Sequence, residues 1–248
     1  MVGRIQKNSF RAQLVFTVAA SACLLFQQTS LAAPVTTFDA NVSEWDSGTV
    51  AVPGVIIPIG GSGQVNGNFV VVEDSAFPNI QIGIRAIERF SPTPLPNTGS
   101  DYVAQTGESG GSGSGLPTWN YDLHIDLRGS GLSFDDFVID VATTVTNHSA
   151  ADLQAAIEFG SILPAGSLNA VELFQSSTNP GFFASGINPF DPTSYPFSLT
   201  ITPKLGVNGP TLTAGMVVNV VPEPTSAMLI LLGLGGVFGV VRRRRWSN

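Results

Sequence analysis

Residues 119–128 alternate strictly between large apolar and polar side chains, and this pattern constrains the fold more than any other feature of the chain. Successive side chains of a β-strand point to opposite faces, so the apolar residues share one face and the polar residues share the other. The apolar set is Trp119, Tyr121, Leu123, Ile125 and Leu127, and the polar set is Asn120, Asp122, His124, Asp126 and Arg128. The pattern predicts a half-buried strand whose polar face lies in solvent.

Short segments of the same kind recur through the middle of the chain, without a repeat period or a long helical pattern. Turn residues separate them, and 107–115 is a loop rich in glycine and serine. Only 151–159 has the pattern of a short helix, and it fits a strand almost as well. The other strand candidates are 54–59, 69–73, 80–86, 137–146, 171–174, 197–202 and 216–221. We expect an all-β fold, an antiparallel and jelly-roll-like β-sandwich that forms one ectodomain over 33–221.

The N-terminus has the three parts of a secretory signal peptide. A basic stretch without acidic residues precedes the apolar run 12–26, and a short stretch of small and polar residues follows. We expect a signal peptide over 1–32, cut by signal peptidase between Ala32 and Ala33. This cut also removes Cys23, the only cysteine, so the mature chain has no disulfide and no thiolate chemistry.

The C-terminus also has three parts, in a fixed order. Pro222, Glu223 and Pro224 come first, and the prolines keep this strip extended and accessible because they oppose a helix. The apolar run 226–241 follows, long enough as a helix of about 25 Å to cross a bilayer. Four arginines then hold the end on the cytoplasmic side as a stop-transfer signal. They are Arg242, Arg243, Arg244 and Arg245 in the basic tail 242–248.

This order resembles the PEP-CTERM sorting signal, which exosortase-type transpeptidases recognise in Gram-negative bacteria and which is also labelled the ice-binding-protein C-terminal domain. The Pro-Glu-Pro strip, the glycine-rich apolar run and the arginine cluster carry the resemblance, over 222–248. It implies recognition at the strip by an exosortase, cleavage nearby, and transfer of the ectodomain to the cell surface or extracellular matrix. A plain C-terminal anchor is the alternative that the residues leave open.

The charge of the middle segment agrees with export and argues against nucleic acid as a partner. Residues 33–221 hold four basic residues against 17 acidic ones, whereas both ends of the chain are basic. Basic flanks stay in the cytoplasm while the segment between them is translocated. An acidic ectodomain has no surface to neutralise phosphates.

Two groups of residues are candidates for metal binding. Asp122, His124 and Asp126 share one face of the predicted strand, although any solvent-facing strand of an acidic domain would have such residues. The second group is Asp135, Asp136 and Asp140, whose clustered oxygens suit a structural calcium ion. Neither group follows a known metal-binding motif.

The leading hypothesis for function is an exported, non-enzymatic protein of the cell surface or extracellular matrix, with no cofactor and no catalytic residue. One alternative is a carbohydrate-binding module attached to exopolysaccharide, which would need exposed aromatic rings. The aromatic candidates are Trp45, Phe182, Phe183, Tyr195 and Phe197. A second alternative is a secreted glycan hydrolase, which would need two carboxylates about 5–10 Å apart in a cleft.

Overall fold

The computed structural model describes residues 33–46, 48–58, 65–91, 93–143, 147–148, 170–182 and 187–223. Within these ranges the chain is all-β and has no α-helix; its 3-10 turns include η1 (Phe134–Asp136) and η3 (Pro180–Phe182). The strands are β1 (Pro34–Ala40), β2 (Thr49–Val52), β3 (Val55–Pro58), β4 (Phe69–Asp74), β5 (Phe77–Glu88), β6 (Asn97–Thr98), β7 (Asp101–Gln105), β8 (Trp119–Asp126), β9 (Phe137–Thr143), β10 (Asn147–His148), β11 (Leu173–Thr178), β12 (Ser194–Pro203) and β13 (Leu212–Val221).

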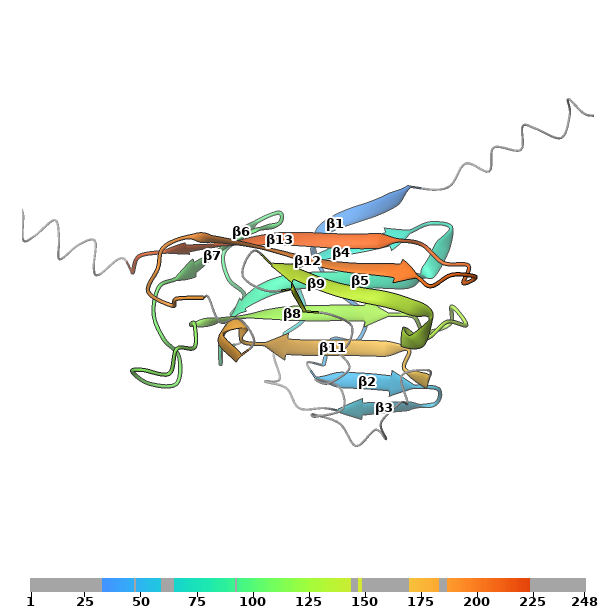
Figure 1. Ribbon diagram of the computed structural model, residues 1–248, viewed down its shortest axis with the longest axis horizontal. Coiled ribbons are helices and arrows are strands. Elements are labelled where there is room, and N and C mark those ends of the chain that lie inside the picture. The colour runs from blue at the N-terminus through green and yellow to red at the C-terminus, as the bar shows by residue number, and fades with distance from the viewer. Residues whose placement is uncertain are drawn as a thin grey trace, which may run out of the picture. The chain divides into compact units, whose positions relative to one another are not determined.

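The strands form two sheets (Figure 1). The first sheet has the order β1-β4-β5-β8-β11-β2-β3, and the second has the order β10-β9-β12-β13-β7-β6. All pairs are antiparallel except β13 with β7, which run parallel. The expected antiparallel arrangement thus holds for all pairs but this one. Within the described residues the two sheets together have 13 strands, more than the eight of a jelly roll.

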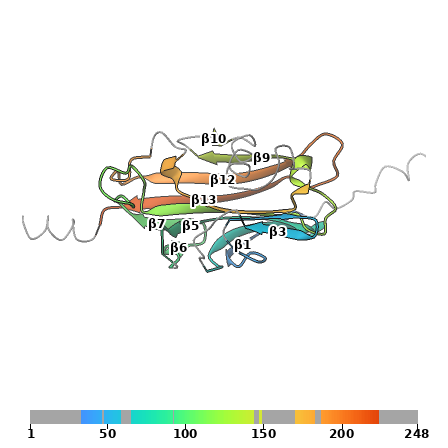
Figure 2. The same cartoon turned by 90° about the horizontal axis from the view of Figure 1, so that it is seen from below.

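The two sheets lie face to face as the two layers of a sandwich (Figure 2) and share one hydrophobic core. The apolar face of β8 points into this core, as the alternation predicts. Trp119 and Tyr121 of β8 meet Phe197 of β12, with ring centroids 5.7 and 5.3 Å apart. The alternating pattern thus positions the large rings that join the two layers.

The outer face of the first sheet is also buried, and this corrects the prediction that the polar face of β8 lies in solvent. Residues 41–46, between β1 and β2, fold over this face, and we call them the covering segment. Its residues Val42 and Trp45 pack on Phe69 and Val71 of β4 in a second, smaller core. The run 69–72 is apolar at every position, which is typical of a strand buried on both faces.

A glycine allows the covering segment to lie this close to the sheet. Gly83 of β5 faces Val42, and a Cβ atom built at position 83 would stand 3.1 Å from Val42 Cγ1 and 3.3 Å from Phe69 Cδ1. Any larger residue would have to displace these side chains. The glycine is therefore a packing requirement of the second core.

The strand candidates of the middle segment are found near their predicted positions, and 107–115 lies in the loop between β7 and β8. The helix candidate 151–159 and the predicted signal peptide 1–32 lie outside the described residues, as does the predicted span 226–241. No helix in the described ranges is both long enough and apolar enough to span a membrane.

Candidate functional site

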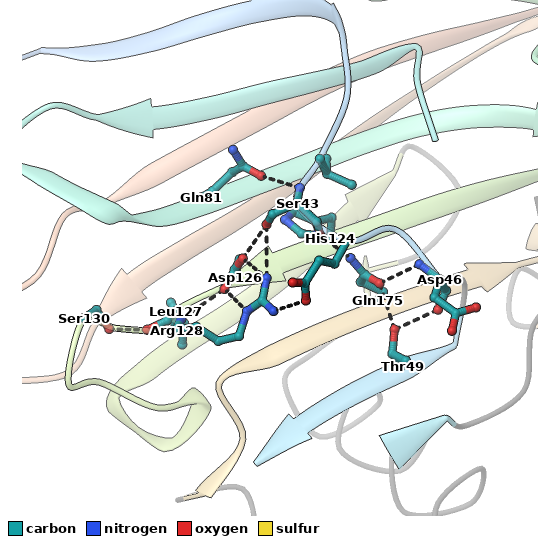
Figure 3. Close-up of polar contacts among 12 residues, drawn as sticks. Ser43, Asp46, Thr49, Gln81, His124, Asp126, Leu127, Arg128, Ser130 and Gln175 are labelled. Carbon is teal, nitrogen blue, oxygen red and sulfur yellow. Dashed lines mark hydrogen bonds and ion pairs between the residues drawn. The ribbon is translucent and has the colours of Figure 1, made fainter. Parts of the chain in front are cut away.

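A layer of buried polar side chains lies between the first sheet and the covering segment (Figure 3). Strand register builds it, because Arg85 of β5 lies opposite Asp122 of β8, and His124 of β8 lies opposite Gln175 of β11. We call this set the polar layer: Thr49, Arg85, Asp122, His124, Asp126 and Gln175. Asp122, His124 and Gln175 are 0% exposed, so these residues, which look solvent-facing in the sequence, have no access to bulk water.

Gln175 fastens the covering segment to the sheet. Its Nε2 group donates hydrogen bonds to the carbonyl oxygen of Ser43 and to Nδ1 of His124, both at 3.0 Å. Its Oε1 atom accepts from the backbone N–H of Asp46 at 3.0 Å and from the hydroxyl of Thr49 at 2.8 Å. Every polar atom of this amide is used, which fixes its orientation and ties the covering segment and β2 to β8 and β11.

The same amide fixes the protonation state of His124. Because Nδ1 accepts a hydrogen bond, the proton of the neutral ring is on Nε2. The pKa of His124 is lowered to about 3, with burial as the main cause; the Asp126 carboxylate opposes this effect and the charge of Arg128 adds to it. The imidazole of His124 is thus neutral and fully buried, and its Nδ1 atom is hydrogen-bonded to Gln175. It supports the packing of the covering segment, and a substrate cannot reach it.

Arg85 and Asp122 form a buried ion pair, with 2.7 Å between Nε and Oδ2. Nη1 of Arg85 also donates to the carbonyl oxygens of Val65 and Gly67, at 2.9 and 2.6 Å. The guanidinium lies 4.3 Å from the ring centroid of Phe69. Burial raises the pKa of Asp122, and the charge of Arg85 opposes this effect. The pair thus ties residues 65–67 to the first sheet, next to the second core.

At the edge of the polar layer, Asp126 and Arg128 bind the covering segment through Ser43 and Glu44. Arg128 donates to both carboxylate oxygens of Asp126, with Nε at 2.9 Å and Nη2 at 2.7 Å, and it also pairs with Glu44. The hydroxyl of Ser43 donates to Asp126 as well. Burial alone would raise the pKa of Asp126, but the hydrogen bonds from Arg128 and Ser43 outweigh burial, so the pKa is lowered.

The structure shows where the residues of the first candidate metal site lie. Asp122, His124 and Asp126 do share a face, but each is engaged in the contacts just described. In the part of the chain that the structure describes, no group of three or more histidine, cysteine or acidic residues is placed to hold a metal ion.

The structure gives separate surroundings to the three aspartates proposed for calcium. Asp135 accepts from Lys204 Nζ at 2.9 Å. Asp136 accepts from the backbone N–H of Ser133 at 2.8 Å, at the start of η1. Asp140 is an exposed residue of β9. The first two side chains are thus used in local structure, and the three aspartates are not brought together as one ligand set.

A second region lies where β13 ends, and we call it the sorting end. The parallel pairing of β7 with β13 places Gln105 beside Val221, and the N–H of Thr106 donates to the Val221 carbonyl at 2.8 Å. Pro222 and Glu223 continue from the strand as exposed residues. The loops that meet here comprise 89–91, 106–118, 179–182 and 187–193. At this end, on the left of Figure 1, the last described residues leave the sandwich.

Residues 220–245 match the family model of the PEP-CTERM protein-sorting motif. The chain carries a PEP-CTERM sorting signal. No curated protein and no solved structure matches this chain. The PEP-CTERM motif indicates exosortase-dependent sorting of an exported protein. Its first two residues, Val220 and Val221, are still part of β13, so the signal begins inside the folded sandwich.

Beside the PEP-CTERM strip, the sorting end exposes phenylalanine rings that the sequence analysis only partly identified. Phe182 is 60% exposed, and Phe90 and Phe190, which were not candidates, are 72% and 61% exposed. The position of Phe90 after a long strand and directly before Ser-Pro is the signal that could have indicated a turn. Of the other aromatic candidates, Trp45, Tyr195 and Phe197 are buried, and Phe183 is outside the described residues.

Proposed function

We propose that this chain is an exported precursor that an exosortase recognises at Pro222, Glu223 and Pro224, and that its β-sandwich is released or transferred to the cell surface or extracellular matrix. The match of residues 220–245 to the sorting motif carries this proposal. Pro222 and Glu223 are exposed and follow directly after β13, which suits recognition of the strip while the sandwich stays folded.

We further propose that the sandwich acts without catalysis, as a structural or binding protein. The residues with most potential for acid–base chemistry, His124 and Asp122, are fully buried and engaged under the covering segment. A general acid or base must reach its substrate, directly or through one water. The carbohydrate-binding alternative has less support than the sequence suggested, because three of its five aromatic candidates are buried. For the hydrolase alternative, no pair of carboxylates is singled out by the site.

The experiment replaces Pro222, Glu223 and Pro224 together with alanine in the native host and measures intact mass in the inner membrane, envelope and medium. The parent should yield a product that begins near Ala33 and ends near the strip, whereas the variant should accumulate uncleaved in the inner membrane. A matched control replaces three exposed residues at the opposite end of the sandwich, Leu205, Asn208 and Thr211. Normal maturation of the strip variant would refute recognition at this site.

A further inference from the structure

We propose that in the membrane-anchored precursor the sorting end of the sandwich lies against the bilayer, with the rings of Phe90 and Phe182 in the lipid headgroup region. This inference rests on the proposed function, because it requires that 226–241 span the membrane. The partner is the lipid interface itself, and no second protein is needed. The contact would hold the Pro-Glu-Pro strip at the membrane surface, where a membrane-embedded transpeptidase acts.

The length of chain between the sandwich and the predicted span sets the distance. Only residues 222–225 separate the last residue of β13 from 226–241. The five Cα–Cα steps from residue 221 to residue 226 reach at most about 18 Å when fully extended. The headgroup layer on each side of the hydrocarbon core is itself roughly 5–8 Å thick. The sorting end is therefore held close to the lipid surface.

The exposed phenylalanines are concentrated at this end. In the described ranges four phenylalanines are exposed, and Phe90, Phe182 and Phe190 belong to the loops of the sorting end, whereas Phe38 lies in β1. Two backbone hydrogen bonds hold these loops together, from Arg89 N–H to the Thr118 carbonyl at 2.8 Å and from Gly107 N–H to the Pro189 carbonyl at 2.7 Å. Exposed rings in neighbouring loops of one end are a feature of interaction surfaces, and Phe90 and Phe182 share a contact with Arg89.

Arg89 gives this surface the amphipathic character of a bilayer interface. Its guanidinium lies over two exposed rings, 4.5 Å from the centroid of Phe90 and 5.3 Å from that of Phe182. Nη1 also donates to the hydroxyl of Ser109 at 3.0 Å, which holds the side chain in place. An arginine between apolar rings can offer its charge to lipid phosphate while the rings enter the acyl boundary. The nearby Glu108 carboxylate is turned onto the N–H groups of the 113–115 turn.

The backbone at Phe90 supports a role for its side chain. Phe90 has a φ angle of 60°, in the left-handed region where a bulky residue is strained. Glycine or asparagine would fit this turn with less strain, yet the position presents a ring that is 72% exposed and buries little of it. A strained residue whose side chain is mostly exposed points to a contact made outside the folded protein.

The experiment places single fluorescent labels on the precursor without its signal peptide, residues 33–248, in nanodiscs of phosphatidylethanolamine and phosphatidylglycerol. Removal of 1–32 also removes Cys23, the only natural cysteine, and Phe90→Cys or Phe182→Cys carries an environment-sensitive dye. Ser91→Cys labels the same turn with both rings intact, in case a replacement disturbs it. Leu205→Cys is the matched control, because it is fully exposed at the opposite end. Lipids that carry a nitroxide then report contact by quenching the dye.

We expect a blue shift and quenching at positions 90, 91 and 182, and neither at 205. Equal, water-like signals at all four positions would overturn the proposal, provided that the chain resists alkaline extraction from the bilayer. Loss of the chain on extraction would instead refute the anchored precursor, and so the proposed function. A blue shift of the dye at position 90 that occurs only in native membranes containing the exosortase would identify a contact with a protein. This result would also overturn the lipid proposal.

Discussion

The polar layer and the sorting end use their side chains in opposite ways. The polar layer collects charged and titratable groups and closes them under the covering segment, where Gln175 and Asp122 are 0% exposed. The sorting end exposes large apolar rings beside a sequence that another enzyme recognises. Residue chemistry alone made Asp122, His124 and Asp126 of the first region candidates for metal binding. The comparison teaches that burial and partners, rather than residue type, decide which group can act on another molecule.

The largest expected effect comes from breaking the buried ion pair in the polar layer. Arg85→Met removes the partner of Asp122 and leaves a buried carboxylate, which should cost about 3–5 kcal/mol of unfolding free energy. Urea unfolding of the processed ectodomain measures this cost. The matched control is Lys204→Met, whose side chain is 46% exposed and pairs with the exposed Asp135, so that its loss should cost about 1 kcal/mol or less. Equal losses in the two variants would contradict the buried character of the Arg85 pair.

The next effect tests how closely the covering segment packs. Gly83→Ala places a methyl group 3.1 Å from Val42 Cγ1, so we expect a loss of about 1–3 kcal/mol and faster hydrogen exchange over 41–46. Gly215→Ala in β13 is the control, because its nearest neighbour stands at 3.7 Å. If Gly83→Ala had the same unfolding free energy and the same hydrogen exchange over 41–46 as the control, Val42 would not pack closely on position 83.

Acid should weaken the polar layer through His124. Its pKa is lowered from 6.5 to about 3 in the folded chain, so the unfolded chain binds more protons below pH 6.5, and the unfolding free energy falls with pH. Between pH 6.5 and about 5, where carboxylates barely titrate, we expect a loss of about 1–2 kcal/mol.

One variant assigns this acid loss to His124. His124→Gln should show a flatter dependence of unfolding free energy on pH over the same interval. An unchanged slope in His124→Gln would show that another group is responsible.

The smallest expected effect is at the sorting end, and it is a gain in unfolding free energy rather than a loss. Phe90→Gly relieves a residue at φ 60° and removes a ring that is mostly in solvent, so stability should rise by about 1 kcal/mol or less. Thermal unfolding of the ectodomain measures it, and Phe190→Gly serves as a control for loss of an exposed ring. A clear loss of stability in Phe90→Gly would mean that the ring supports the fold, which removes one argument for the membrane contact.

Much of the fold was predictable, because alternation and turn residues are local signals. The strand 119–126 and the inward direction of its large rings follow from residue order alone. The burial of the polar face did not follow, because it depends on the covering segment, which is about 80 residues away in the chain from the strand that it covers. The fully apolar run 69–72 was a local sign of a sheet covered on both faces.

The sequence by itself determined the sorting signal at the end of the chain, since three linear parts in a fixed order need no fold to be recognised. It also determined the all-β class, through a period of two. Only the tertiary structure decided that Asp122, His124 and Asp126 are internal supports, and that Phe90, Phe182 and Phe190 share the end from which the signal leaves. The physical reason is that both outcomes depend on pairing between distant strands, which sets the neighbours of each side chain and its access to water.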